Sequence, residues 1–231
     1  PAGRIPVDWG VARVRELGAV CAGRQRSPSY TEGKLVPYLR VANVFDGWIS
    51  TEDVLQMKFT DAEFQRYHLK PGDILLNEGQ SLELVGRSAI YRGNPPKCCF
   101  QNTLVRFRPN DDVDSEFMQL VFQRCLAQGR FAAIASKTTS IAHLGVSRFA
   151  HLRVVAAPIE EQKKIAEILS QWDHAIRLQE ELIREKEERK RGLMQQLLTG
   201  KRRLPGFGGE WKEYRLGDVF RERAETGRED L

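Results

Sequence analysis

Apolar residues recur at helical spacing over the longest uninterrupted pattern in the chain, residues 158–200. One heptad position is apolar at both ends and polar in the middle, at Gln179 and Lys186. The pattern predicts one helix over residues 158–199, which at about 1.5 Å per residue reaches roughly 60 Å. Such a stripe packs against another helix; the alternative, a solvated helix, would leave it exposed. We assign to the stripe the side chains Ile165, Leu169, Trp172, Ile176, Leu182, Ile183, Leu193 and Leu197.

Shorter patterns in residues 1–157 are typical of a mixed α/β globule, so the predicted fold class is α+β with a long α-helix after the globule. Within one predicted strand, Leu104 and Arg106 alternate with Val105 and Phe107, as in a half-buried strand. The strands are predicted over residues 37–44, 73–77, 88–91 and 103–108.

Two short helices are predicted among these strands, over residues 60–68 and 114–128. Thr60 and Glu63 have the spacing of a capping box at the start of the first helix. Residues 137–147 are polar and predict a loop.

Two short motifs occur twice at one spacing, which indicates an internal duplication. Trp9 and Trp211 fall slightly out of phase with that spacing, as a small shift in a loop would produce. We interpret residues 200–231 as a linker and the start of a second, truncated repeat. The matching motifs are Arg4-Ile5-Pro6 with Arg203-Leu204-Pro205, and Leu17-Gly18-x-Val20 with Leu216-Gly217-x-Val219.

Charge and cysteine usage narrow the class of protein. The 231 residues carry a formal net charge of +5, which favours a polyanionic partner without requiring one. The 4 cysteines form no C-x-x-C pair, so we expect reduced thiols in a cytoplasmic protein and no zinc site. Neither a signal peptide nor a membrane span is indicated.

Sequence signals for catalysis are missing. The chain has neither a phosphate-binding G-x-x-x-x-G-K-[ST] loop nor a dinucleotide-binding G-x-G-x-x-G motif. Residues 94–97, Asn-Pro-Pro-Lys, lack the aromatic ring that an amino-methyltransferase stacks on its target base. The histidines are scattered, so we expect a non-catalytic protein without cofactor or metal.

The start of the predicted long helix resembles a known family. Residues 158–173, PIEEQKKIAEILSQWD, are similar to the P-x-x-E-Q-x-x-I-A-x-x-L-x-x-x-D segment of type I restriction–modification specificity subunits. Residues 200–219 resemble the linker of these subunits to their next target-recognition domain. Gly72-Asp73-Ile74-Leu75 and Val36-Pro37-Tyr38-Leu39-Arg40 are similar to landmarks inside such domains.

The resemblance implies a non-catalytic subunit that reads double-stranded DNA and holds methyltransferase (modification) subunits and restriction (translocase–nuclease) subunits on it. Residues 1–157 would be the target-recognition domain, and residues 158–199 the spacer helix. Family members carry two such units whose helices pack antiparallel as a coiled coil, whereas this sequence carries one unit, as a half-length form or a fragment would. We therefore expect a homodimer through the long helix, each copy reading one half of a bipartite site.

Two polar loops are candidates for DNA contact, because base edges and phosphates are bound by Arg, Lys, Asn, Gln, Ser and Thr. The first loop lies near residues 77–81 and is followed by Arg87; the second lies at residues 137–140. The predicted DNA-binding residues are Gln80, Ser81, Arg87, Lys137, Thr138, Thr139 and Ser140, with Arg40 and Asn43 as further candidates. An alternative function is a coiled-coil scaffold that binds proteins and has no DNA specificity.

Overall fold

The computed structural model describes residues 5–27, 29–137 and 141–220. The chain divides into two compact units, Pro1–Gln171 and Trp172–Leu231. The fold is α+β, as the sequence predicts, with several small sheets and one long helix. The first unit extends beyond residue 157, the predicted domain boundary, because the first turns of the long helix pack against its core.

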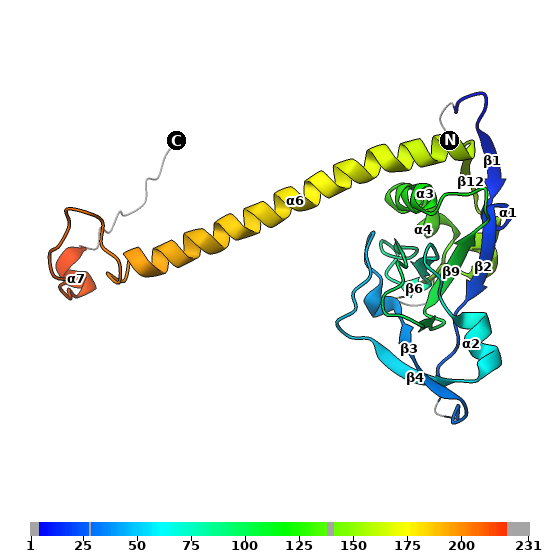
Figure 1. Ribbon diagram of the computed structural model, residues 1–231, viewed down its shortest axis with the longest axis horizontal. Coiled ribbons are helices and arrows are strands. Elements are labelled where there is room, and N and C mark those ends of the chain that lie inside the picture. The colour runs from blue at the N-terminus through cyan, green and yellow to red at the C-terminus, as the bar shows by residue number, and fades with distance from the viewer. Residues whose placement is uncertain (1–4, 28, 138–140, 221–231) are drawn as a thin grey trace, which may run out of the picture. The chain divides into compact units, whose positions relative to one another are not determined.

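A four-stranded antiparallel sheet, in the order β2-β9-β5-β7, forms the centre of the first unit (Figure 1). Ile74 lies opposite Phe107, and both side chains enter one buried cluster. Leu75 lies opposite Arg106 on the other face, where Leu75 joins a second cluster. Both faces of the sheet are therefore covered. Its strands are β2 (Gly18–Ala22), β9 (Leu104–Pro109), β5 (Ile74–Asn77) and β7 (Ser88–Ile90), which confirms the predicted strands at 73–77, 88–91 and 103–108.

Short helices pack on the first face of this sheet. The ring of Phe122 lies 5.3 Å from that of Phe107 and 5.3 Å from that of Phe149, centroid to centroid, in edge-to-face contact. Asp114 caps the longest of these helices by accepting a hydrogen bond from the Phe117 amide, which confirms the predicted helix at 114–128. The helices are α1 (Val14–Leu17), α3 (Ser115–Ala127), α4 (Arg130–Ile134) and α5 (Val146–His151).

A second sheet and a helix cover the other face. The sheet has the order β4-β3-β8, and its residues Leu39 and Phe100 enter the second cluster with Leu75. Its strand β3 begins and ends earlier than the predicted strand at 37–44, because a 3-10 turn follows at Val41–Asn43. The Thr60–Glu63 capping box is confirmed at the start of α2. The elements are β3 (Lys34–Leu39), β4 (Leu55–Phe59), β8 (Cys99–Phe100) and α2 (Asp61–Tyr67).

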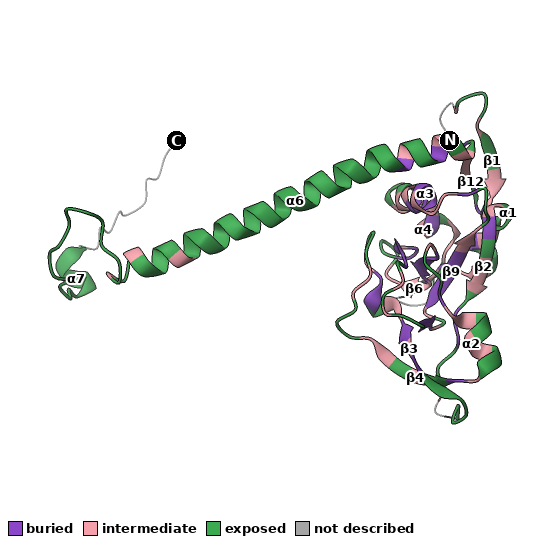
Figure 2. Ribbon diagram, in the orientation of Figure 1, coloured by how far each residue is buried: buried purple, intermediate pink, exposed green. Residues whose placement is uncertain are grey.

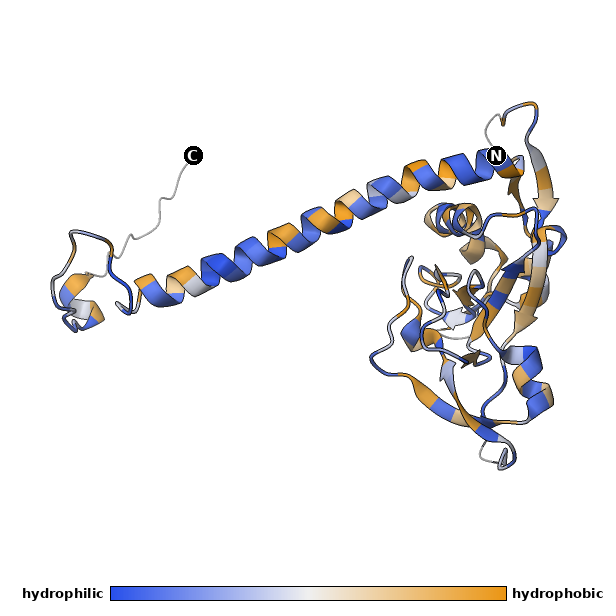
Figure 3. Ribbon diagram, in the orientation of Figure 1, coloured by the Kyte–Doolittle hydropathy of each residue, from blue (hydrophilic) through white to orange (hydrophobic). Residues whose placement is uncertain are grey.

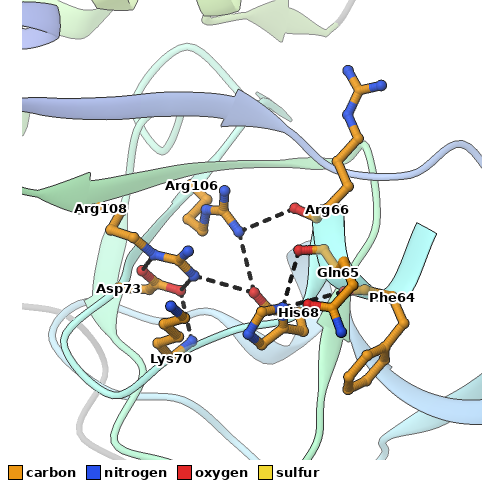
Figure 4. A network of polar contacts seen from close by, with 8 residues as sticks. All are labelled: Phe64, Gln65, Arg66, His68, Lys70, Asp73, Arg106 and Arg108. Carbon is orange, nitrogen blue, oxygen red and sulfur yellow. Dashed lines mark hydrogen bonds and ion pairs between the residues drawn. The ribbon is translucent and has the colours of Figure 1, made fainter. Parts of the chain in front are cut away.

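A buried charge on the central strand β9 was not expected from the sequence. Arg106 is only 7% exposed, so the prediction that β9 is half-buried is wrong. Its guanidinium donates to the carbonyl oxygens of Arg66 and His68, and Arg108 binds Asp73 through two hydrogen bonds of 2.6 and 2.7 Å (Figure 4). The network fixes the end of α2 and the turn before β5 to the sheet.

The long helix α6 (Ile159–Leu197) confirms the helix predicted at 158–199. Its Glu161 accepts a hydrogen bond of 2.8 Å from Trp9 Nε1. Gln162 is buried, accepts from the Asp114 amide at 2.9 Å and donates to the Ala157 carbonyl at 2.8 Å. The Glu-Gln pair therefore fastens the start of α6 to the N-terminal segment and to α3. Strand β1 (Gly10–Arg13) pairs with β12 (Arg153–Ala156), the strand that precedes α6.

The rest of α6 keeps its apolar residues exposed. Figure 2 shows exposed residues along almost all of the helix after its first turns, and Figure 3 shows apolar bands recurring among polar ones. Trp172 is 67% exposed and Ile176 is 53% exposed. No described helix, α6 included, is long and apolar enough to cross a membrane.

A short helix in the second unit changes the alignment of the internal duplication. In α1 the Arg13 amide donates to the Glu16 carboxylate, and in α7 (Leu216–Val219) the Arg215 amide donates to Asp218. When Arg13 is aligned with Arg215 on this basis, Trp9 aligns with Trp211 without any shift. The match between Leu17-Gly18-x-Val20 and Leu216-Gly217-x-Val219 is therefore wrong, because Gly18 begins a strand whereas residues 216–219 form a helix.

Candidate nucleic-acid interface

The first predicted DNA loop is an excursion of residues 78–86 between β5 and β7. Its base is closed by two backbone hydrogen bonds of 2.9 Å, from Asn77 N to Arg87 O and from Gly86 N to Asn77 O. At its tip, the Ser81 carbonyl accepts from the amides of Leu84 and Val85. The loop therefore has a defined backbone and presents Gln80 and Ser81, both half-buried, near its start.

Three short strands join this loop to the second predicted loop. They are β10 (Ser136–Lys137), β11 (Ala142–His143) and β6 (Gly79–Gln80), in the antiparallel order β10-β11-β6. Ala142 lies opposite both Lys137 and Gln80, so these two candidates occupy one row of one sheet. The prediction that residues 137–147 form a loop is therefore wrong in part. Thr138, Thr139 and Ser140 lie outside the described residues.

Charged side chains surround this small sheet. His143 Nδ1 lies 2.9 Å from a Glu78 carboxylate oxygen, and Arg148 donates to Ser136 Oγ and to the His143 carbonyl at 2.9 and 2.7 Å. The pKa of Glu83 lies below its ordinary value, because its carboxylate accepts hydrogen bonds from its own amide and from Ser81, with Lys137 nearby. His143 and Arg148 were not among the predicted site residues. Their place beside Lys137 in the sequence was the available signal.

Arg87 stacks on an aromatic ring. Its guanidinium carbon lies 5.0 Å from the centroid of Phe45, and its buried Nε has no hydrogen-bond partner among the described residues. Phe45 in turn stacks on Trp48. The sequence analysis did not single out either ring, although the Phe-Asp-Gly-Trp stretch is typical of a turn.

The two remaining candidates, Arg40 and Asn43, lie at the ends of the 3-10 turn that follows β3. Asn43 is 1% exposed, and its amide donates to the carbonyls of Ser50 and Asp53 at 3.2 and 3.0 Å. It braces a loop, so we correct its assignment from a DNA-facing side chain to a structural one. Arg40 is paired with the exposed Asp53 carboxylate.

The first residue of the predicted apolar stripe on α6 differs from the rest in its surroundings. Ile165 packs against the core of the first unit, so we correct its assignment to the intermolecular stripe. Leu197 is half-buried. The other stripe residues are exposed: Leu169 41%, Trp172 67%, Ile176 53%, Leu182 44%, Ile183 57% and Leu193 37%.

Cysteine chemistry does not contribute to this surface. Burial raises the pKa of Cys98 and of Cys99 to about 12, so both thiols stay protonated at neutral pH. Within residues 5–27, 29–137 and 141–220, no three His, Cys, Asp or Glu side chains gather as a metal site would require.

Comparison with known families assigns the chain. Residues 6–188 match the model of the type I restriction modification DNA specificity domain. The chain belongs to this family. The match covers all but the first few residues of the first unit and most of α6.

Curated relatives support the same assignment. The chain is 27% identical over 201 residues to the type I restriction enzyme MjaVIII specificity subunit of Methanocaldococcus jannaschii, covering 85% of this chain and 43% of that protein. The MjaX protein of the same organism is 28% identical over 202 residues, with 85% and 47% coverage. The type I restriction enzyme EcoKI specificity subunit of Escherichia coli K12 is 25% identical over 174 residues, with 73% and 37% coverage. The chain therefore spans about half the length of the first two relatives.

Solved structures share the fold. A chain from a structural study of complex assembly and conformational transition of the type I R-M system aligns with a TM-score of 0.59 and 21% identity, covering 84% of this chain and 46% of that one. The HsdS subunit from Thermoanaerobacter tengcongensis aligns with a TM-score of 0.54 and 19% identity, covering 77% and 40%.

Proposed function

We propose that this chain is a non-catalytic DNA-reading subunit of a type I restriction–modification complex, and that its first unit reads one half of a bipartite target. The observation that carries the proposal is the row of Gln80 and Lys137 in one small sheet of a specificity-domain fold. A polar amide and a cation in one row, on either side of Ala142, provide the two kinds of contact that sequence-specific binding needs.

The side chains of this surface divide into two roles. Gln80 reads a base edge, because an amide can donate to and accept from adenine in the major groove. Arg87 reads guanine, since stacking on Phe45 restricts the guanidinium plane before DNA arrives. Lys137 and Arg40 bind phosphates, which fixes the position of the subunit on DNA without selecting a sequence. Ser81, Thr138, Thr139 and Ser140 provide small hydroxyl groups for either role.

The partners follow from this assignment. A non-catalytic subunit that reads DNA acts by recruiting enzymes to that DNA. We propose that methyltransferase subunits and a restriction subunit bind this chain, in keeping with the specificity subunits that it resembles.

A second copy of the chain would supply the other half of the site. The apolar stripe residues of α6 from Leu169 to Leu193 are exposed in the single chain. We propose that two copies of α6 pack antiparallel in a two-fold dimer. A two-fold protein matches an inverted DNA repeat, with the unread gap set by the helix length.

Substitutions at the row test the DNA-reading role. The chain is co-expressed with its methyltransferase subunits, the methylated bases are mapped, and binding to the target is measured at several salt concentrations. We expect Lys137→Ala to weaken binding to every sequence alike and to lower the salt slope by about 1. Gln80→Ala should instead relax one base position, at about 1–3 kcal/mol.

Two exposed residues of the first unit serve as controls. Lys34→Ala removes a cation that is 81% exposed and pairs with Asp61, and Gln65→Ala removes an exposed amide on α2. Both variants should bind as the unmodified chain does. Unchanged binding of Lys137→Ala and Gln80→Ala would contradict the assignment of the small sheet.

A further inference from the structure

An exposed tryptophan stands at the end of a three-layer stack beside the proposed DNA surface. The guanidinium carbon of Arg87 lies 5.0 Å from the Phe45 centroid, and the rings of Phe45 and Trp48 are 4.4 Å apart and nearly parallel, at 8°. Among the described residues, Phe45 is the only ring or cation recorded in contact with the indole. Trp48 is 55% exposed.

The turn that carries Trp48 is fixed to three other elements. Phe45 N donates to Trp48 O at 2.9 Å, which closes the turn, and Gly47 N donates to Ser88 O of β7 at 2.9 Å. Gln123 of α3 donates to Asp46 at 3.0 Å. Asn77 Nδ2 of β5 donates to the carbonyl of the preceding residue, Val44, at 3.4 Å.

A glycine is required inside this turn. Gly47 has a φ of +79°, a conformation that side chains rarely adopt. The hydrogen bonds of the turn and the Phe45 ring position the indole before binding, which lowers the ordering cost at the moment of binding.

An exposed, pre-positioned indole is typical of a binding contact. Tryptophan is among the residues that contribute most to interfaces, because it has a large rigid apolar area. Packing on Phe45 covers one face of the indole and leaves most of the residue in solvent. A purely structural role would need only the covered face.

The position of Trp48 in the fold favours DNA as the molecule that its indole contacts. Arg87, the first layer of the stack, is also the residue that closes the 78–86 loop on which Gln80 lies. The stack is thus continuous with the surface that we propose to read DNA. Thymine is the base that offers an apolar group, its 5-methyl, on the major-groove edge.

We propose that Trp48 is a specificity-determining residue, whose indole packs on the 5-methyl group of a thymine in the half-site read by this unit. This inference rests on the proposed function. The two stacking distances, 5.0 and 4.4 Å, keep the indole close to the guanidinium. At about 3.4 Å per base step, the thymine lies within about three steps of the base that Arg87 contacts.

The experiment removes the methyl group and the indole separately. The target of the complex with methyltransferase subunits is first mapped from its methylated bases, and each thymine is then replaced by deoxyuridine in turn. For the unmodified chain we expect one such replacement to weaken binding about fourfold, the value of one buried methyl group. Trp48→Ala should bind thymine and deoxyuridine at that position equally, and Trp48→Phe should keep part of the discrimination.

Controls separate folding from recognition. Leu35→Ala removes another apolar side chain of the same unit, 65% exposed, and should leave the thymine preference intact. The melting temperature of each variant shows whether it folds, and Trp48→Phe preserves an aromatic layer if Trp48→Ala does not. Arg87→Ala should relax a position within about three steps of the methyl-sensitive thymine.

Three results would overturn the inference. The first is a Trp48→Ala variant that still discriminates deoxyuridine from thymine at every position. The second is equal weakening on all DNA sequences, which indicates a backbone contact. The third is loss of methyltransferase binding with unchanged DNA preference, which indicates a protein contact. If the unmodified complex prefers no DNA sequence, the proposed function itself fails, and that result is distinct from all three.

Discussion

The beginning and the remainder of α6 have the same heptad pattern but different surroundings. In the first turns Gln162 is buried and bonded at both ends of its amide, and Ala166 is buried. From Leu169 to Leu193 the apolar stripe residues are between 37% and 67% exposed. Apolar spacing alone therefore does not distinguish a stripe that packs within its own chain from one that does not.

Polar contacts mark the difference. Where α6 packs within the chain, each polar group facing the core has a partner, as Glu161 has Trp9 and Gln162 has Asp114. The middle of the helix offers exposed Gln179 and Lys186 instead. The comparison predicts that substitutions in the first unit change its stability, whereas those in the outer helix change association.

The largest effect is expected in the aromatic core. Phe122 is completely buried and contacts the rings of Phe107, Phe131 and Phe149. Phe122→Ala should lower the free energy of unfolding by about 3–5 kcal/mol, because it removes apolar contacts and leaves a cavity. Urea denaturation measures this change, and a loss below about 1 kcal/mol would show that this core is not tightly packed.

Breaking the ion pair between Asp73 and Arg108 should have the next largest effect on the free energy of unfolding. Asp73 is 1% exposed, and Asp73→Ala leaves Arg108 and the nearby buried Arg106 without an anion (Figure 4). We expect a loss of about 3 kcal/mol in the free energy of unfolding. Asp53→Ala is the matched control, since Asp53 also pairs with an arginine but is 71% exposed. It should lose at most about 1 kcal/mol, and equal losses in the two variants would refute the role of burial.

The glutamine at the start of α6 tests the comparison directly. Gln162→Ala leaves the Asp114 amide without its acceptor and should lower the free energy of unfolding by about 1–3 kcal/mol. Gln179→Ala removes the same amide from the exposed part of the helix and should change it by less than about 0.5 kcal/mol. The same denaturation experiment measures both variants, and the prediction fails if Gln179→Ala is the more damaging one.

Local signals account for the parts of the fold that the sequence predicts. The capping box at Thr60 and the apolar spacing of α3 and α6 involve residues within a few positions of one another. These signals do not depend on which distant segment packs nearby. Helices 60–68, 114–128 and 158–199 were therefore predictable, as were three strands of the central sheet.

The errors arise from distant contacts. Arg106 looked solvent-facing because nothing local indicates that the β4-β3-β8 sheet and α2 cover the second face of β9. Residues 137–147 looked like a loop because their partner strand, β6, lies far away in the sequence. For the same reason, residue types indicated Gln80 and Lys137 as candidates, but their common row could not be predicted. Trp48 was missed because its proposed role depends on a contact with Arg87 through Phe45, and Arg87 is distant from both rings in the sequence.

A smaller effect is expected at the capping box of α2, and it depends on pH. Burial raises the pKa of Glu63, but hydrogen bonds from Thr60 and from Arg24 outweigh it, so the pKa lies below the ordinary value of 4.5. A depressed carboxyl pKa stabilises the fold above about pH 4.5, and this contribution is lost as pH falls through the folded-state pKa. Glu63→Gln keeps a capping side chain but not the charge, and should lower the free energy of unfolding at pH 7 by about 1 kcal/mol.

The pH dependence provides the control for this variant. The difference between Glu63→Gln and the unmodified chain should shrink as the pH is lowered below 4.5. Denaturation at several pH values measures it. A difference that stays constant between neutral and acidic pH would mean that the charge on Glu63 contributes nothing.

Substitutions in the exposed part of α6 should have the smallest effect on the stability of the first unit. The same substitutions should have the largest effect on dimer formation. Trp172→Glu with Ile176→Glu places charges on two residues that are 67% and 53% exposed in the single chain. The first unit should unfold within about 0.5 kcal/mol of the unmodified chain when both are compared as monomers. The mass by light scattering should fall from two copies to one, because carboxylates in a helix–helix seam remain unpaired. Arg184→Glu, at an exposed position of α6 outside the stripe, is a control for charge alone and should not abolish the dimer. A monomeric unmodified chain at micromolar concentration would leave the exposed stripe without its proposed partner and refute the dimer.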